Sequence, residues 1–363
     1  MTKTMNTKVT PSRPVIRAAT GSTYNGFYLR DNLASTGTVP AVGPYNLCPD
    51  IIQSSTAIPD PQDTLSTLES WNRMYNAEPA PGDNYYYVRG LNGASSGKFE
   101  GAVSLFWTPA ELILFPSLWK HNQLCTASGS ETVSVSASPG HIGVAAEPFL
   151  LPWPTVSSQS TRSTFASFIA QNTAVAIPTI SSWIEMSQFM TQQLNFGSRN
   201  AKSFDPLANA GTMLERMGIS IPLTLGESGT LQFMLTSAGL VGDTLGLIVD
   251  QYTPEQKVVQ ILPTQITQEE ELFGVQATID PGFTASLAVQ YWNTSKQVPA
   301  RGSTITLSVN YVVPKDQLDA ALLMGVIDSR LGQEIARQLG HDVKPQAVAP
   351  IGAVTFVAVP SGS

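Results

Sequence analysis

The sequence predicts a mostly β protein built from two antiparallel β-sandwiches, with one helix inserted into the first and another near the C-terminus. Short apolar segments with alternating side chains recur along most of the 363 residues, and glycine and proline separate them. Apolar residues at helical spacing occur in far less of the chain. Because the length exceeds one typical domain, we expect two.

The domain boundaries follow from changes in this pattern. The first residues, MTKTMNTKVTPSRPVIR, are polar and basic and contain Pro11 and Pro14, so we expect a flexible arm. Pro314 ends the last long β pattern and precedes a helical one. We therefore divide the chain into an N-terminal arm at 1–20, a β-sandwich at 21–200, a second β-sandwich at 201–314, and a C-terminal helix with a terminal strand at 315–363.

The stretch Asn84–Pro109, NYYYVRGLNGASSGKFEGAVSLFWTP, is central to the first sandwich. Tyr85–Arg89 is aromatic and β-branched, and Ala102–Trp107 alternates, so both predict strands. Glycines separate them, which predicts a β-hairpin or a longer connection between sheets. One face of the second strand carries three residues that we expect in the core, namely Val103, Leu105 and Trp107.

Other segments complete the first sandwich. Tyr24–Asp31 predicts a first strand, and the polar stretch Ser54–Asp83 predicts a surface excursion whose Trp71 and Tyr75 fold back onto the sheet. Leu112–Trp119 is strongly apolar but contains a proline, which predicts an edge segment or a loop that covers the end of the sandwich. Further short segments suit strands, namely Thr132–Ser136, Ile142–Ala146, Phe149–Trp153 and Thr164–Ala170.

Six short motifs follow one another between about Tyr24 and Lys202: YLRD, PDII, NYYYVR, LFWTP, FLLPWP and NFGSRNA. In this order they resemble an immunoglobulin-like module of bacterial surface and secreted proteins. The chain departs from the module at Gly90 and Leu91, where the YVRV strand usually continues into a polar turn, and in the long insert before Asn84. The resemblance implies a non-catalytic immunoglobulin-like β-sandwich, and it transfers no catalytic residue.

The stretch Thr179–Leu194 predicts the inserted helix, which Thr179 or Ser181 could cap. An interfacial membrane helix would also place aromatic residues and methionine on one face, but the polar face here has no lysine or arginine, so we disfavour it. The apolar residues near helical spacing are Ile180, Trp183, Ile184, Met190 and Leu194.

The second half repeats the alternating pattern. Alternation is clearest in LQFML and in LAVQY, where every second residue is apolar. Seven strands are predicted, at Ile219–Leu225, Thr230–Thr236, Leu245–Asp250, Val258–Leu262, Phe273–Ile279, Thr284–Trp292 and Thr304–Val313.

Beyond the second sandwich, Asp316 can cap a helix that runs to about Leu339 and stops at Gly340. A last apolar strand, Ala353–Val359, must be covered by a sheet of its own chain or of another copy, and we favour another copy. The apolar stripe predicted for the helix is Leu323, Ile327, Leu331, Ile335 and Leu339.

Groups that could perform chemistry are sparse, so we predict no enzyme and assign no catalytic, cofactor-binding or metal-binding residue. The histidines at 121, 141 and 341 lie far apart, and none has a metal-ligand spacing. The acidic run 269–271 could bind Ca²⁺, but a solvated face is the favoured interpretation. Asn293-Thr294-Ser295 fits a glycosylation acceptor. Cys48 and Cys125 could pair, but two free thiols are favoured.

Charge and hydropathy limit the classes of partner that we expect for this chain. The net charge is −7 and lysine and arginine form no cluster, which argues against nucleic acid as the main partner. No apolar run is long enough to span a membrane, and no signal peptide is visible. Charged residues make up only 13% of the chain, a composition that suits an extracellular, surface or self-assembling protein.

Three hypotheses remain open. The first is a non-catalytic structural or binding protein that forms homo-oligomers through its arm and C-terminal elements, with a host surface or glycan as a further ligand. The second is a secreted toxin or effector that binds a host surface or membrane, inserting Leu112–Trp119 or the Thr179–Leu194 helix. The third is a viral coat protein, although the arm holds few positive charges with which to pack a genome, namely Lys3, Lys8, Arg13 and Arg17.

Overall fold

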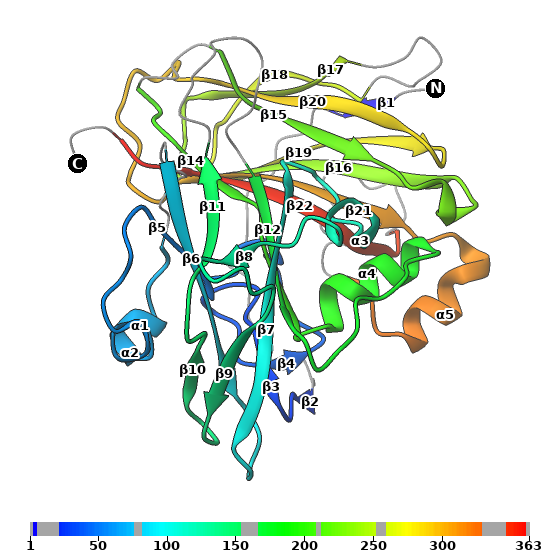
Figure 1. Cartoon of the computed structure of the whole chain (residues 1–363). Coiled ribbons are helices and arrows are strands. Elements are labelled where there is room, and N and C mark those ends of the chain that lie inside the picture. The colour runs from blue at the N-terminus through cyan, green and yellow to red at the C-terminus, as the bar shows by residue number, and fades with distance from the viewer. Residues whose placement is uncertain are drawn as a thin grey trace.

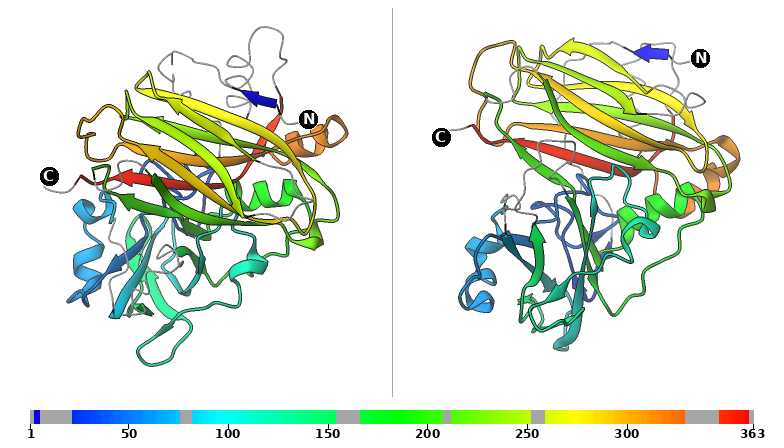
Figure 2. Two further views of the ribbon diagram at one scale, coloured as in Figure 1. Left: turned by 90° about the horizontal axis from the view of Figure 1, so that it is seen from above. Right: turned by 45° about the horizontal axis from the view of Figure 1, so that its top comes forward.

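The computed structural model describes residues 3–5, 22–75, 82–153, 166–207, 212–251, 259–328 and 346–360. As predicted, the protein is mostly β, with several antiparallel sheets and few short helices. Its two halves are stacked, and the strands of the second half run across the end of the first (Figure 1 and Figure 2).

The first half is a sandwich of two sheets. One has the order β10-β6-β11-β8, with β3 and β5 also paired to β6, and the other has the order β13-β12-β7-β9. Their inner faces meet in one apolar cluster, to which β6 contributes Tyr86 and Val88 and β7 contributes Val103 and Leu105. The strands are β2 (Ser22–Thr23), β3 (Phe27–Tyr28), β4 (Thr38–Val39), β5 (Ile51–Ser54), β6 (Gly82–Asn92), β7 (Phe99–Pro109), β8 (Cys125–Thr126), β9 (Val133–Ala137), β10 (Ile142–Val144), β11 (Phe149–Trp153), β12 (Ala166–Asn172) and β13 (Phe196–Arg199).

The central pair of predicted strands, β6 and β7, is confirmed, but the two lie in different sheets. The hairpin alternative is therefore wrong, and the longer connection between sheets is correct. The reason lies at the end of β6, where Leu91 and Asn92 pair with β3 on one side and Leu91 with β10 on the other. With both edges of β6 occupied, β7 crosses to the opposite sheet.

Both faces of β7 are covered. Trp107 packs against the same cluster as Val103 and Leu105, as predicted, but it is only partly buried. Phe106, on the other face, is 2% exposed and its ring centroid lies 5.1 Å from that of Trp119. The strand therefore supplies two apolar clusters at once.

This arrangement predicts unequal effects of truncation on β7. Phe106→Ala should lower the free energy of unfolding by about 3–5 kcal/mol, because it empties a filled site next to Trp119. Trp107→Ala should cost less, because part of its ring already contacts solvent. Urea unfolding of both variants measures the difference, and a larger loss for Trp107→Ala would contradict the assignment.

The second half is also a sandwich. One sheet has the order β15-β20-β17-β18 and the other has the order β1-β19-β16-β21-β22-β14. Alternating residues fill the space between them, and Leu231, Phe233 and Leu235 are fully buried as predicted. The strands are β1 (Lys3–Met5), β14 (Ala201–Phe204), β15 (Thr212–Ser220), β16 (Gly229–Ala238), β17 (Thr244–Gln251), β18 (Ile261–Gln265), β19 (Glu270–Ile279), β20 (Thr284–Trp292), β21 (Thr304–Val312) and β22 (Val348–Ala358).

The strand pairs of this half are nested. The innermost pair is β17 with β18, followed outward by β16 with β19 and β15 with β20. The outermost pair would be β14 with β21, and β22 separates these two strands. Successive pairs alternate between the two sheets, which is the connectivity of a jelly roll with one extra strand.

The terminal strand lies inside its own chain. β22 pairs antiparallel with β21 and parallel with β14, in the sheet that faces the first half (Figure 1). Our preference for pairing between copies is therefore wrong. β22 lies between β14, which begins the second half, and β21, which comes near its end. Since these strands are far apart in sequence, the sequence pattern could not show this position.

The helices are short. The inserted helix is confirmed as α4 (Trp183–Gln192), although Ser182 caps it and not Thr179 or Ser181. The predicted C-terminal helix is cut short: α5 (Leu318–Leu323) ends before Gly325, whose φ of 66° is readily adopted only by glycine. Leu323, predicted on a buried stripe, is 90% exposed, and residues 329–345 lie outside the described part. The remaining helices are α1 (Pro61–Leu65), α2 (Leu68–Trp71), α3 (Pro116–Trp119), and the 3-10 turns η1 (Leu223–Leu225) and η2 (Lys315–Gln317).

Candidate functional site

Residues from three of the sequence motifs meet in the core of the first half. Arg30 of YLRD, Asp50 of PDII and Arg89 of NYYYVR form a buried cluster in which each side chain is at most 1% exposed. Arg30 donates from Nη2 to Asp50 Oδ1 at 2.6 Å and from Nε to Oδ2 at 3.1 Å. Arg89 donates from Nε to Asp50 Oδ1 at 3.1 Å. One carboxylate thus serves two guanidinium groups.

The surface excursion closes over this cluster, as predicted for its aromatic residues. The Arg30 guanidinium carbon lies 3.3 Å from the ring centroid of Trp71, a cation–π contact. Arg89 donates to Ser70 Oγ at 2.8 Å and to the carbonyl oxygens of Leu65 and Ser70. The partners of the cluster are therefore supplied by the protein itself, and removing one of them would leave a buried charge unpaired.

The last motif, NFGSRNA, joins the two halves. Arg199 donates to the carbonyl oxygens of Ile51 and Tyr75, and burial lowers the pKa of Arg199 to about 10. Its neighbour Asn200 donates from Nδ2 to the carbonyl oxygens of Glu111, at 2.7 Å, and Ala353, at 2.9 Å. Because Ala353 lies in β22, this amide bridges the two sandwiches.

The apolar segment after β7 forms the rest of the junction. Leu112 donates its backbone N–H to the Gly218 carbonyl at 2.8 Å, and Gly218 donates to the Ala110 carbonyl at 2.7 Å. On the other side, a Cβ at Gly352 of β22 would lie 2.3 Å from the Leu112 carbonyl oxygen. Leu112–Trp119 therefore does not cover a free end of the sandwich. Its first residue, Leu112, lies between β15 and β22 of the other half.

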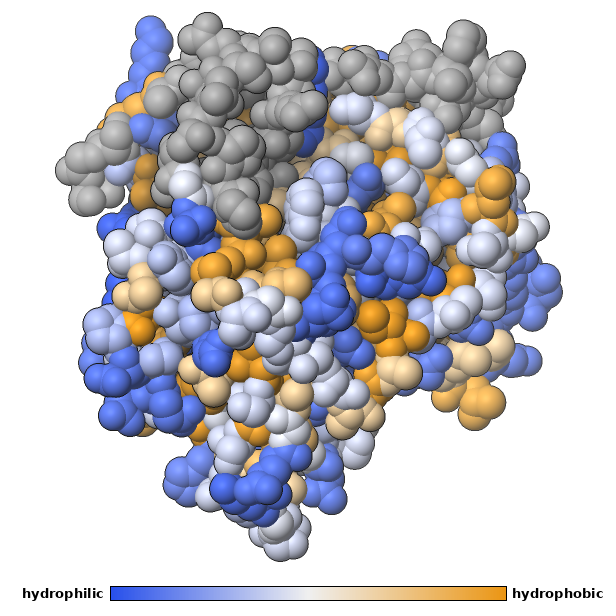
Figure 3. Space-filling view, in the orientation of Figure 1, coloured by the Kyte–Doolittle hydropathy of each residue, from blue (hydrophilic) through white to orange (hydrophobic). Residues whose placement is uncertain are grey.

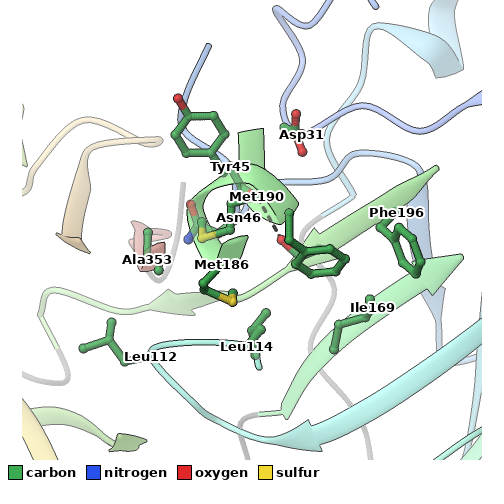
Figure 4. Close-up of a pocket in the computed structure, with 13 residues that line it drawn as sticks. Asp31, Tyr45, Asn46, Leu112, Leu114, Ile169, Met186, Met190, Phe196 and Ala353 are labelled. Carbon is green, nitrogen blue, oxygen red and sulfur yellow. Dashed lines mark hydrogen bonds between the residues drawn. The ribbon is translucent and has the colours of Figure 1, made fainter. Parts of the chain in front are cut away.

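A small cavity of about 30 Å³ lies at this junction (Figure 4). Apolar side chains from α4 and from the first half line most of it, including Met186 and Phe196. Asp31 lines it too, is 5% exposed, and has no hydrogen-bond partner for Oδ2. Burial raises the pKa of Asp31 well above its ordinary value, and repulsion by Asp50 raises it further. The volume suits a water molecule, not an organic substrate.

The histidines and acidic residues considered in the sequence analysis do not form a common site among the described residues. His121 and His141 are exposed on the first half, and His341 lies outside the described part. Among the described residues, no group of three or more histidine, cysteine or acidic side chains is placed to hold a metal ion. Of the acidic run 269–271, Glu271 is buried and accepts hydrogen bonds from Thr267. Asn293 donates to the carbonyl oxygens of Pro206 and Gln297.

Cys48 and Cys125 are both free thiols, which agrees with the favoured alternative. Burial raises the pKa of the Cys48 thiol, with a further contribution from Asp50. The thiolate is the reactive form, so Cys48 is an inert core residue.

Exposed apolar side chains occur at both ends of the second sandwich. At one end, Val298 is 61% exposed and belongs to loops joined by hydrogen bonds such as Asn293 to Pro206 and Thr294 to Gly242. Figure 3 shows small apolar areas scattered among polar ones on one face. No described helix is both long and apolar enough to span a membrane. The other exposed apolar residues of these ends are Leu207, Val241, Leu223, Leu322, Leu323 and Met324.

Sequence reasoning missed one residue of this junction, Glu111. Its carboxyl lies against Gly218 of β15, and within the described part of the chain Ser220 alone donates a hydrogen bond to it. The signal was a single charged residue directly before the apolar run LILF. Such a carboxylate is either solvated or packed at a contact, and the structure places it at a contact, partly buried.

Comparison with known proteins identifies no family. The chain matches no protein-family model, and no curated protein matches it. Among solved structures, it is similar to one described as manganese lipoxygenase of Gaeumannomyces graminis with part of zonadhesin of Komagataella pastoris, at 11% identity and a TM-score of 0.18 over 84% of this chain and 95% of that one. It is also similar to the CupB6 tip adhesin from Pseudomonas aeruginosa, at 8% identity and a TM-score of 0.16 over 77% and 91%. The chain is thus a β-rich, multi-sheet protein with a weak structural likeness to a bacterial tip adhesin.

Proposed function

We propose that this chain is a non-catalytic structural protein that assembles with copies of itself into a shell, as a viral coat protein does. The observation that carries the proposal is the nested strand order of the second half. Jelly rolls of this order form viral capsid domains as well as lectins and cupins. Charged residues make up only 13% of the chain, so repulsion between charged side chains of neighbouring copies is limited.

The N-terminal arm supports assembly. Its residues Lys3–Met5 form β1, which pairs antiparallel with β19 at the edge of the second sandwich. The next described strand, β2, lies at the far end of the first half (Figure 1). A connection as long as residues 6–21 can span roughly 50 Å, enough to reach a neighbouring copy. An unpaired β19 edge would accept such a strand through backbone hydrogen bonds.

Deleting residues 1–17 should leave the fold intact and weaken assembly. The described part of this segment, Lys3–Met5, pairs at a sheet edge, so its loss should not unfold the sandwich. Light scattering after size exclusion and negative-stain images measure the assembled fraction, and circular dichroism measures the fold. A purified full-length chain that stays monomeric at all concentrations would refute the proposal.

A crosslink identifies the copy that supplies β1. Lys3 and Gln276 are register partners. Chains carrying Lys3→Cys are mixed with chains carrying Gln276→Cys, both with Cys125→Ser, and oxidised after assembly. A disulfide-linked dimer is expected, and Gln265→Cys on the exposed strand β18 is the matched control. If a disulfide forms only in a chain that carries both Lys3→Cys and Gln276→Cys, β1 pairs with β19 of its own chain.

A surface-binding role is the second candidate. The motifs that resemble an immunoglobulin-like module of bacterial surface and secreted proteins converge on one buried cluster, and jelly rolls also serve as lectins. A glycan array with the purified chain tests it, and specific binding by a monomer would favour this role over shell assembly. Membrane insertion is less favoured, because Leu112–Trp119 and α4 would first have to leave the junction.

A further inference from the structure

The junction between the sandwiches contains a partly buried acid, Glu111, which forms no ion pair among the described residues. Glu111 follows β7 of the first half and forms a backbone bridge with Gly218 in β15 of the second. Its carboxyl is packed directly on that glycine, since a Cβ at position 218 would lie 2.3 Å from Oε1 and 2.8 Å from Oε2. The contact therefore requires glycine on one side and an acid that fits flat against it on the other.

The hydrogen bonds around this carboxyl are incomplete. Ser220 donates from Oγ to Glu111 Oε1 at 3.2 Å, while Oε2 is buried and has no partner. Among the described residues, the ion pairs are Arg30–Asp50, Arg89–Asp50 and Lys98–Glu100, none of which involves Glu111. An incomplete set of hydrogen bonds costs a neutral carboxyl less free energy than an ionised one, because the ionised carboxylate also loses the solvation of a full charge.

The described side chains that contact the Glu111 backbone are uncharged. Ser167 of β12 and Asn200 approach the Glu111 backbone, and both side chains are neutral. β22, which packs on the following residues, has no charged residue in its sequence. The cationic residues of the neighbouring strands are Arg216 of β15 and Lys202 of β14.

We infer that the Glu111–Gly218 contact is a proton-dependent latch, which holds the two sandwiches together while Glu111 is neutral and loosens when it ionises. Ionisation places a negative charge directly against Gly218, whose backbone hydrogen bonds with Ala110 and Leu112 join the halves. The latch acts within one chain, so it does not depend on assembly. Asp31, whose Oδ2 has no hydrogen-bond partner among the described residues, lines the neighbouring cavity with Tyr45 and Asn46 and is a second acid whose pKa burial raises.

The direction of the pH dependence follows from the titration. Burial raises the pKa of Glu111 from its ordinary value of 4.5 to about 7, and the Ser220 hydrogen bond opposes this only in part. The folded chain then holds a proton that the unfolded chain has already lost. The contribution to stability is full below about pH 4.5 and is lost progressively until about pH 7.

Melting temperature against pH tests the latch. Between pH 5.5 and 8.5 the wild-type chain should lose on the order of 5 °C, and Glu111→Gln should abolish most of that loss. Glu100→Gln, at an exposed acid, is the matched control and should keep the wild-type profile. Hydrogen exchange of the Leu112 and Gly218 amides, corrected for its intrinsic pH dependence, should accelerate at high pH in the wild type and not in Glu111→Gln.

A measurement on the wild-type chain keeps the inference falsifiable if the variant misfolds. Carbon-13 NMR of labelled glutamate follows the Glu111 carboxyl directly, and its midpoint should lie near 7. A midpoint near 4.5, or an unchanged pH profile in a folded Glu111→Gln chain, would overturn the latch.

Discussion

Asp50→Asn is expected to lower the free energy of unfolding by about 3–5 kcal/mol, because it leaves two buried guanidinium groups without the carboxylate that they share. Arg30 and Arg89 remain in place against Trp71 and Ser70, so they cannot move to solvent without opening the excursion. Burial already lowers the pKa of Arg89, and Asp50 opposes that effect. Urea unfolding followed by tryptophan fluorescence measures the loss.

The exposed pair Lys98–Glu100 supplies the control for this experiment. Its side chains are 56% and 71% exposed, so Glu100→Gln removes an ion pair of the same type without desolvation. The control should unfold at the wild-type urea concentration. An Asp50→Asn chain as stable as this control would show that the buried cluster contributes nothing to the fold.

Ending the chain after Gln346 is expected to prevent the second sandwich from folding. The truncation removes β22, whose residues between Val348 and Ala358 are almost all buried and which pairs with strands on both sides. Without it, β14 and β21 present open edges and the apolar core faces solvent. The expected product is insoluble or binds a hydrophobic dye, and loss of the far-UV β signal measures the change.

Two controls separate strand loss from general damage. Ending the chain after Pro360 removes none of β22 and should leave folding unchanged. A synthetic peptide covering 346–360 should restore part of the β signal to the truncated chain, because a strand supplied in trans can complete an open sheet. If the chain truncated after Gln346 were folded without the peptide, β22 would not be an integral strand of this sheet.

The sequence by itself determined the local elements. Side-chain alternation is a property of a single segment, so Leu231, Phe233 and Leu235 identified the buried face of β16 without knowledge of its partners. Spacing around Trp183 likewise identified α4. The order of the six motifs indicated that Arg30, Asp50 and Arg89 belong to one unit, although not that their charges meet.

The tertiary structure alone decided how these elements combine, because pairing depends on contacts between residues far apart in the chain. Local pattern could not show that β6 and β7 enter opposite sheets, since the choice depends on β3 and β10 occupying the edges of β6. Nor could it place β22 between β14 and β21. Glu111 packs at the junction only because Gly218, more than a hundred residues away in sequence, lets its carboxyl lie against a bare backbone.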